Sequence, residues 1–193
     1  MTELSLKGVR VLDMGQVVSM PYCGQMLGWM GAEVILVETP RRTTARLTPP
    51  FAYGRDGFNT SGLFNLLNTN KRSFTINLAE EKGVNLIKEL VRVSDVVMEN
   101  FATRTMPKFG LDYDELRKVK PDIIMISLSA LGRTGPMKDY VGMHSSANLF
   151  SGVATVTGYG PEDRPRLLGS VLPDTLAGEA AFLAILQALY YRQ

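Results

Sequence analysis

The sequence contains one cysteine and one histidine in 193 residues, and this scarcity excludes several kinds of protein. The single cysteine, Cys23, cannot form an internal disulfide bond, which is typical of a reducing compartment, so we expect the protein to be cytoplasmic. His144 has no second histidine and no nearby cysteine to share a metal ion with, so we expect no metal site.

The sequence also has little excess of positive or negative charge and few long apolar runs. A formal net charge of +2 is too small to indicate a nucleic-acid partner. Residues 175–191 form the longest apolar segment, but Glu179 and Gln187 interrupt it, and it is shorter than the roughly 20 residues that cross a bilayer. We therefore expect a mostly buried helix there and no membrane partner. The first seven residues also lack the pattern of a secretory signal.

Two common motifs are missing. No G-x-G-x-x-G follows the first predicted strand, which excludes the fingerprint of nicotinamide dinucleotide binding. No G-x-S-x-G is present either, so the sequence gives no support for a serine nucleophile of the hydrolase type.

What the sequence does contain is an alternation of strands and helices. Apolar, β-branched runs predict strands at 9–14, 33–38, 74–78, 95–100 and 123–128, and helical spacing predicts helices at 21–30, 80–93, 113–119 and 175–191. This order predicts one α/β domain with a Rossmann-like, doubly wound, mostly parallel sheet flanked by helices. Ligands of such sheets bind beyond the carboxyl ends of the strands, which here carry residues 15–19, 41–42, 100–104 and 129–135.

The polar segment 39–62 should be a surface excursion. It carries Arg41, Arg42, Arg46 and Arg55, which suit either phosphate binding or a solvated surface. The residues alone leave both interpretations open.

Asp174 is the principal candidate for chemistry. Pro173 suits the start of a helix, so Asp174 is expected at or near a helix N-terminus, where the helix dipole favours a carboxylate. The residue is then a simple N-cap or a carboxylate nucleophile; the two roles are compatible, and the local sequence does not decide between them.

Motifs along the whole chain resemble those of the family III CoA-transferases (CaiB/BaiF type), whose members include formyl-CoA and carnitine CoA-transferases. In chain order they are Leu6-Lys7-Gly8-Val9-Arg10-Val11-Leu12-Asp13, Pro21, Gly31-Ala32-Glu33-Val34-Ile35, Asn70-Lys71-Arg72-Ser73, Glu99-Asn100-Phe101, Gly110-Leu111, Gly135-Pro136, Ser151-Gly152, Pro173-Asp174 and Gly178. Each motif is weak alone, but their shared order is specific.

The resemblance implies that Asp174 is the catalytic nucleophile of an acyl-CoA:carboxylate CoA-transferase. Aspartyl anhydride and aspartyl-CoA thioester intermediates would carry the CoA, so coenzyme A and a carboxylic acid are substrates and no cofactor is permanently bound. The chain then corresponds to the N-terminal half of the family's large domain, without the small domain and the C-terminal return segment. The resemblance further implies an interlocked homodimer or a heteromer, and it leaves open whether residues 1–193 alone turn over.

The same resemblance implies a CoA-binding surface on strand ends and turns. Basic side chains there would face phosphates, and the turn 16–19 would lie against the thioester. Its members are Gln16, Val17, Val18, Ser19, Arg41, Asn70, Lys71, Arg72, Asn100, Phe101, Arg104, Lys108 and Gly132. Val18 stands where formyl-CoA transferases carry glutamine, so formyl or oxalate specificity is not expected.

Two alternatives stay open. An α-methylacyl-CoA racemase-like enzyme would use His144 and Asp174 as opposed bases, although the racemase histidine aligns with Met143, one position away. The second alternative, a non-catalytic CoA-binding subunit or fragment, would need neither His144 nor Asp174.

Overall fold

A computed structural model of the chain describes residues 3–40, 44–169 and 171–192. Its centre is a five-stranded, all-parallel sheet in the order β3–β2–β1–β4–β5. The strands are β1 (Arg10–Asp13), β2 (Glu33–Glu38), β3 (Lys71–Thr75), β4 (Val96–Glu99) and β5 (Ile124–Ser127). The carboxyl end of β1 pairs with Leu36 on one side and Met98 on the other, so the carboxyl ends of the central strands share one edge. The predicted α/β fold is confirmed.

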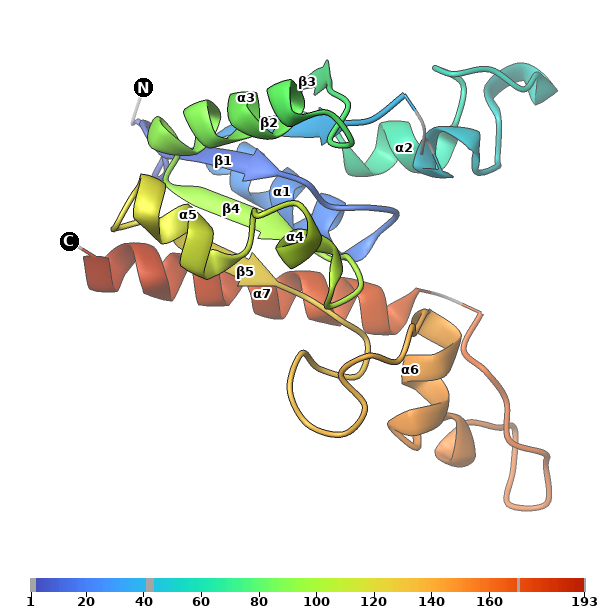
Figure 1. The fold of residues 1–193 in the computed structure, drawn as a ribbon. Coiled ribbons are helices and arrows are strands. Elements are labelled where there is room, and N and C mark those ends of the chain that lie inside the picture. The colour runs from blue at the N-terminus through green and yellow to red at the C-terminus, as the bar shows by residue number, and fades with distance from the viewer. Residues whose placement is uncertain (1–2, 41–43, 170, 193) are drawn as a thin grey trace.

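Helices cover both faces of the sheet (Figure 1). On one face, α1 (Ser19–Trp29) and α7 (Leu172–Arg192) form a core with the strand residues Val11 and Met98. On the other face, α3 (Glu81–Arg92), α4 (Thr105–Lys108) and α5 (Tyr113–Val119) pack on Leu12 and Val97. Successive strand side chains point to opposite faces, which explains why neighbouring residues belong to different cores.

The strand β3 begins three residues earlier than the sequence predicts. Apolar patterning places it at 74–78, whereas it spans Lys71–Thr75 and pairs with β2 from Val34 onward. The prediction is wrong because the first residue, Lys71, is polar yet buried through an ion pair made far along the chain. Local hydrophobicity does not contain that information.

Several short elements have no clear sequence signal. They are the 3₁₀ turns Thr44–Leu47, Ala52–Gly54 and Val153–Val156 and the helices α2 (Gly62–Leu67) and α4. Ser61 caps α2, because its Oγ accepts the N–H of Phe64.

The long helix α7 is less buried than expected. It starts at Leu172 and buries one stripe, Gly178, Ala181, Ile185 and Leu189, while Leu183 is 56% exposed. Among the described residues it is the one helix that is long and apolar enough to cross a membrane by length and composition alone. Its buried stripe packs on α1 and the sheet in this structure.

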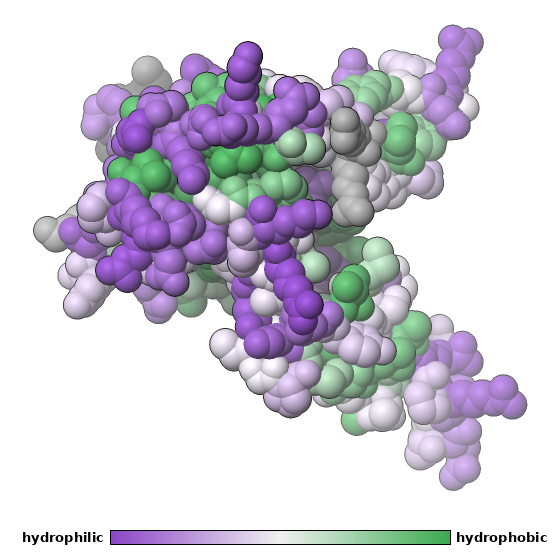
Figure 2. All heavy atoms as spheres, viewed as in Figure 1, coloured by the Kyte–Doolittle hydropathy of each residue, from purple (hydrophilic) through white to green (hydrophobic). Residues whose placement is uncertain are grey.

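An arm formed by residues 137–169, with α6 (His144–Phe150) at its base, projects from the sheet (Figure 1). Figure 2 shows hydrophobic residues interrupting the polar surface of this arm. Tyr140 and Phe150 meet there edge to face, with ring centroids 6.2 Å apart, and both are exposed. The exposed large apolar side chains of the arm are Tyr140, Val141, Met143, Leu149, Phe150, Val156, Tyr159 and Leu167.

Candidate active site

A cleft of about 320 Å³ lies beyond the carboxyl ends of β1, β4 and β5, between the starts of α1, α6 and α7. Its size is at the lower end of the range for small-molecule sites. The lining residues are Gln16, Val17, Val18, Ser19, Asn100, Leu128, Ser129, Ala130, Gly142, Met143, His144, Ala147, Val171, Pro173, Asp174 and Ala177. The structure therefore brings the turn 16–19 and Asn100 together, as a parallel sheet predicts, and the start of α7 adds Asp174 to them.

Asp174 lies inside the first turn of α7, not before it. The helix begins at Leu172, so Pro173 and Asp174 are already helical and the simple N-cap interpretation is wrong. The carboxylate is half-buried, and burial raises its pKa above the usual range. The facing charge of His144 and the residue's own backbone N–H offset part of that rise.

The turn 16–19 is fixed by Asn100, which follows the end of β4. The Asn100 amide oxygen accepts the N–H of Gln16 at 2.7 Å, and its nitrogen donates to the carbonyl oxygen of Gln16 at 2.8 Å and to Ser19 Oγ at 3.0 Å. Within this turn Val17 has a φ of 62°, a conformation that costs a β-branched residue about 1–3 kcal/mol. Asn100 therefore holds a strained turn against the cleft.

The close crossing of α7 and α1 sets the depth of Asp174. Gly178 lies one turn after Asp174, and a Cβ there would come within 2.6 Å of the Ser19 carbonyl oxygen and 3.1 Å of Tyr22 Cδ1. Only glycine permits this approach, so the first turn of α7 lies directly against the start of α1.

Lys71 is a structural residue in this fold. Its ammonium donates to Asp13 Oδ2 at 2.8 Å, to the Pro21 carbonyl oxygen at 2.8 Å and to Asn68 Oδ1 at 2.9 Å. These three bonds use all of its hydrogens, and its side chain is 1% exposed. We expected Lys71 to face a CoA phosphate, but the structure places it under α1 instead.

The other basic residues of the expected CoA surface lie outside the cleft. Arg104 is exposed and forms a two-pronged ion pair with Asp139, with Nη2–Oδ2 at 2.8 Å and Nε–Oδ1 at 3.1 Å. Lys108 is exposed at the end of α4, and Arg72 is exposed on β3, 3.0 Å from Glu33. They are accessible to phosphates but do not border Asp174.

The remaining expected residues also lie away from the cleft lining. Asn70 is exposed with a φ of 59°, just before β3, and Gly132 turns the loop after β5 with a φ of 87°. Phe101 is half-buried against the core of the α3–α5 face. Arg41 lies outside the described residues.

A buried ion pair that the sequence did not point to joins the end of β4 to the loop after β5. Arg133 Nη1 lies 2.9 Å from Glu99 Oε1, although the contact is not an aligned hydrogen bond. Arg133 also donates to the carbonyl oxygens of Phe101 at 3.4 Å and Thr103 at 3.2 Å. Burial raises the pKa of Glu99, while the Ser127 hydroxyl, the Phe101 N–H and the charge of Arg133 oppose the rise. In the sequence, the signal for this pair was Glu99, a lone carboxylate at the end of an apolar strand.

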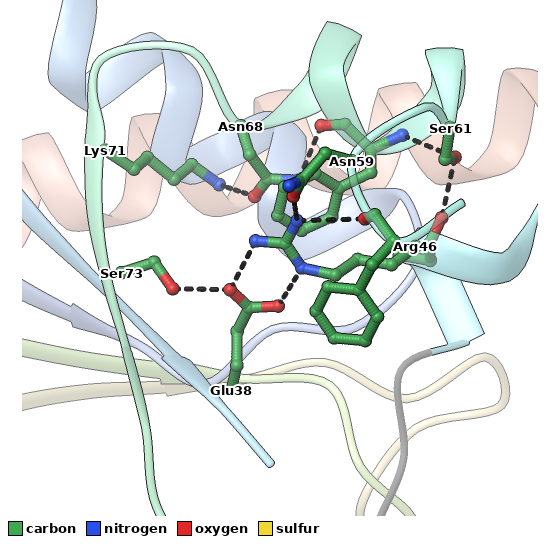
Figure 3. A network of polar contacts seen from close by, with 10 residues as sticks. Glu38, Arg46, Asn59, Ser61, Asn68, Lys71 and Ser73 are labelled. Carbon is green, nitrogen blue, oxygen red and sulfur yellow. Dashed lines mark hydrogen bonds and ion pairs between the residues drawn. The ribbon is translucent and has the colours of Figure 1, made fainter. Parts of the chain in front are cut away.

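Arg46 neither binds an open phosphate site nor lies in solvent. It pairs with Glu38 through two bonds, the longer 2.7 Å, donates to Asn59 Oδ1 at 3.1 Å, and stacks with its guanidinium 3.7 Å from the centroid of the Phe64 ring (Figure 3). Its side chain is 12% exposed. This network ties the excursion after β2 to the strand end.

The described residues offer no metal site, because no three His, Cys, Asp or Glu side chains gather within them. Cys23 lies on the buried side of α1, and burial, followed by the charge of Asp13, raises the pKa of its thiol to about 12. The thiol is therefore not a nucleophile at neutral pH.

Comparison with known proteins gives a consistent result. The chain matches the model of CoA-transferase family III over residues 6–193. It is 38% identical over 189 residues to the succinate–glutarate CoA-transferase of Agrobacterium fabrum, covering 96% of this chain and 47% of that protein. It is 37% identical over 195 residues to the succinyl-CoA–L-malate CoA-transferase beta subunit of Chloroflexus aurantiacus, covering 100% of this chain and 47% of that protein.

A solved structure agrees with these relatives. The crystal structure of a CAIB/BAIF family protein from Brucella suis superposes with a TM-score of 0.91 at 32% identity, covering 99% of this chain and 50% of that one. The chain thus spans about half the length of the relatives that it matches. On the family match and these likenesses, the chain belongs to CoA-transferase family III.

Proposed function

We propose that the protein transfers CoA from a thioester donor to a carboxylic acid acceptor, with Asp174 as the nucleophile. The observation that carries the proposal is a half-buried carboxylate in a small cleft of a family III chain. The carboxylate attacks the thioester carbonyl, expels CoA thiolate and becomes a mixed anhydride. The thiolate attacks the aspartyl carbonyl, releasing the donor acid and leaving an aspartyl-CoA thioester.

The acceptor completes the cycle. Its carboxylate attacks the aspartyl-CoA thioester, forms a second anhydride and releases the thiolate. The thiolate then attacks the acceptor's carbonyl, which yields the new thioester and restores the Asp174 carboxylate. No proton is gained or lost over these steps, so the reaction needs no general base.

The start of α1 supplies donors for the oxyanions of these steps. Val18 and Ser19 line the cleft at the beginning of this helix, and Val18 makes no side-chain cap bond. The first N–H groups of a helix have no partner inside it, and such groups stabilise negative charge that develops on a carbonyl oxygen.

We infer that the substrates include dicarboxylic acids. The relatives compared above are named for succinate, glutarate and L-malate, each of which has two carboxyl groups. Exposed Arg104 and Lys108 suit the phosphates of CoA outside the cleft. The relative named as a beta subunit supports an assembly of two chains. The single cysteine supports our placing the protein in the cytoplasm.

A second candidate is proton exchange at the α-carbon of an acyl-CoA, as in the racemase-like enzymes. It is favoured by one observation, namely that His144 and Asp174 line the same cleft. Deuterium from solvent would enter the α-position without any acceptor acid, which separates it from CoA transfer.

Intact mass spectrometry after incubation with acyl-CoA thioesters tests the proposal. We expect a hydroxylamine-sensitive acyl or CoA adduct that is absent from Asp174→Ala. The matched control is Glu179→Ala, which removes an exposed carboxylate from the same helix and should keep the adduct. An adduct that persists in Asp174→Ala refutes the proposed nucleophile. Deuterium exchange without any adduct favours the second candidate.

A further inference from the structure

His144 is the first residue of α6 and lines the same cleft as Asp174, from a different element. It is half-buried, and its Nε2 lies 3.4 Å from Ser145 Oγ, a long contact that leaves the ring available to a ligand. Its charge acts on the Asp174 carboxylate across the cleft. The imidazole is therefore close enough to influence whatever binds beside Asp174.

The cleft has few charges of its own. Among its described lining residues, His144 is the one side chain that can be positively charged, and Asp174 is the one that can be negatively charged. The basic residues that approach this end of the sheet are already paired. Arg133 is bound to the loop after β4, Lys71 is buried under α1, and Arg46 is paired with a strand-end carboxylate.

A dicarboxylic substrate brings a problem that a monocarboxylic one does not. When one carboxyl group reacts at Asp174, the other adds a second negative charge to a half-buried cleft that already holds a carboxylate. Like charges at close range disfavour each other, and a buried charge needs a partner of opposite sign. The apolar lining, Val171 and Ala177 among it, offers no such partner.

We propose that His144 is a specificity residue, whose imidazolium pairs with the carboxylate remote from the reacting one and so selects dicarboxylic over monocarboxylic substrates. The inference rests on the proposed CoA transfer for the identity of the substrate. It assigns His144 a role in binding, in contrast to the proton transfer that the second candidate function would require.

Adduct formation with a matched pair of thioesters tests this role. Succinyl-CoA and butyryl-CoA have four-carbon acyl chains and differ in the distal carboxylate. In His144→Gln we expect the second-order rate of adduct formation to fall about tenfold for succinyl-CoA, the size of a lost hydrogen bond to a charged group, and less than about twofold for butyryl-CoA. Leu149→Ala, at an exposed position of the same helix outside the cleft lining, should leave both rates unchanged. Equal losses for both thioesters, or no loss, would overturn the inference.

A binding measurement separates this inference from the proposed function. Because the chain has one histidine, a sample labelled with ¹⁵N-histidine gives imidazole signals from His144 alone. Titration with succinate should shift these signals, and titration with butyrate should shift them much less. Equal responses to both acids, or no response, would contradict the role of His144. A selective shift in a protein that forms no adduct would instead reject covalent transfer and retain His144 as a carboxylate-binding residue.

Discussion

Replacing Lys71 by methionine should destabilise the fold strongly, because it breaks a buried ion pair without removing its carboxylate. Asp13 is fully buried and would keep the N–H of Gly15, 2.8 Å away, as a hydrogen-bond donor. The carbonyl oxygen of Pro21 and the amide oxygen of Asn68 would also lose their donor. Breaking a buried pair from one side costs about 3–5 kcal/mol. At about 2–4 °C per kcal/mol for a domain of this size, the Tm should fall by about 6–20 °C.

Urea unfolding followed by circular dichroism measures this change. The midpoint should fall at an unchanged slope, which reports a loss of stability rather than a change in the unfolded chain. Arg72→Met is the matched control, because Arg72 is the next residue of the same strand, is 82% exposed and makes a surface ion pair. It should cost less than about 1 kcal/mol. The double variant Asp13→Asn/Lys71→Met leaves no charge at this buried site and should be more stable than Lys71→Met.

Two results would refute this reasoning. One is a Lys71→Met variant as stable as Arg72→Met. The other is a variant of normal stability with much weaker affinity for CoA, which would make Lys71 a ligand contact, as its sequence motif suggests.

Two further predictions concern α7. Gly178→Ala should destabilise the protein by about 1–3 kcal/mol through overpacking, despite the better helix propensity of alanine, because the new Cβ meets the backbone oxygen of Ser19. The same substitution should slow adduct formation on Asp174. Thermal melts measure the first effect and mass spectrometry the second, and effects no larger than those of Glu179→Ala would contradict the close crossing. Asp174→Asn should be more stable than the wild type at pH 7 and about equally stable at pH 3. The pKa of Asp174 is raised by burial, so the protonated acid stabilises the fold below about pH 3.9 and this is lost as the pH rises through the folded value. Urea midpoints of Asp174→Asn and the wild type at pH 7 and pH 3 measure this, and a difference between the two proteins that is the same at both pH values would contradict the prediction.

Local patterns predict the sheet well where burial is continuous. The run at 33–38 predicts β2 with its observed bounds, and the helix 113–119 is also found as predicted. The start of β3 could not be predicted, since it depends on a contact between Lys71 and Asp13, 58 residues apart. Strand propensity depends on local residue types and therefore does not include an ion pair between residues so far apart in the chain.

The cleft was predictable in part. Parallel topology places the ends of β1 and β4 at one edge, which brings the turn 16–19 beside Asn100. The packing of α7 on α1 could not be derived from residue types, because a glycine such as Gly178 gives no sign of which backbone it will touch. The partner of Arg133 could not be derived either, because its side chain pairs with Glu99 at the end of another strand.

The position of β1 at the middle of the sheet has a consequence during synthesis. Its neighbour β4 ends at Glu99, 86 residues after β1 ends at Asp13. At about 5–20 residues per second, the ribosome needs about 4–17 s to deliver that partner. For that interval the nascent chain can pair β1 only with β2, and its other edge, with the buried Val11 and Leu12, stays open. Translation speed over the first hundred residues should therefore govern how much of the protein is lost to aggregation before it folds.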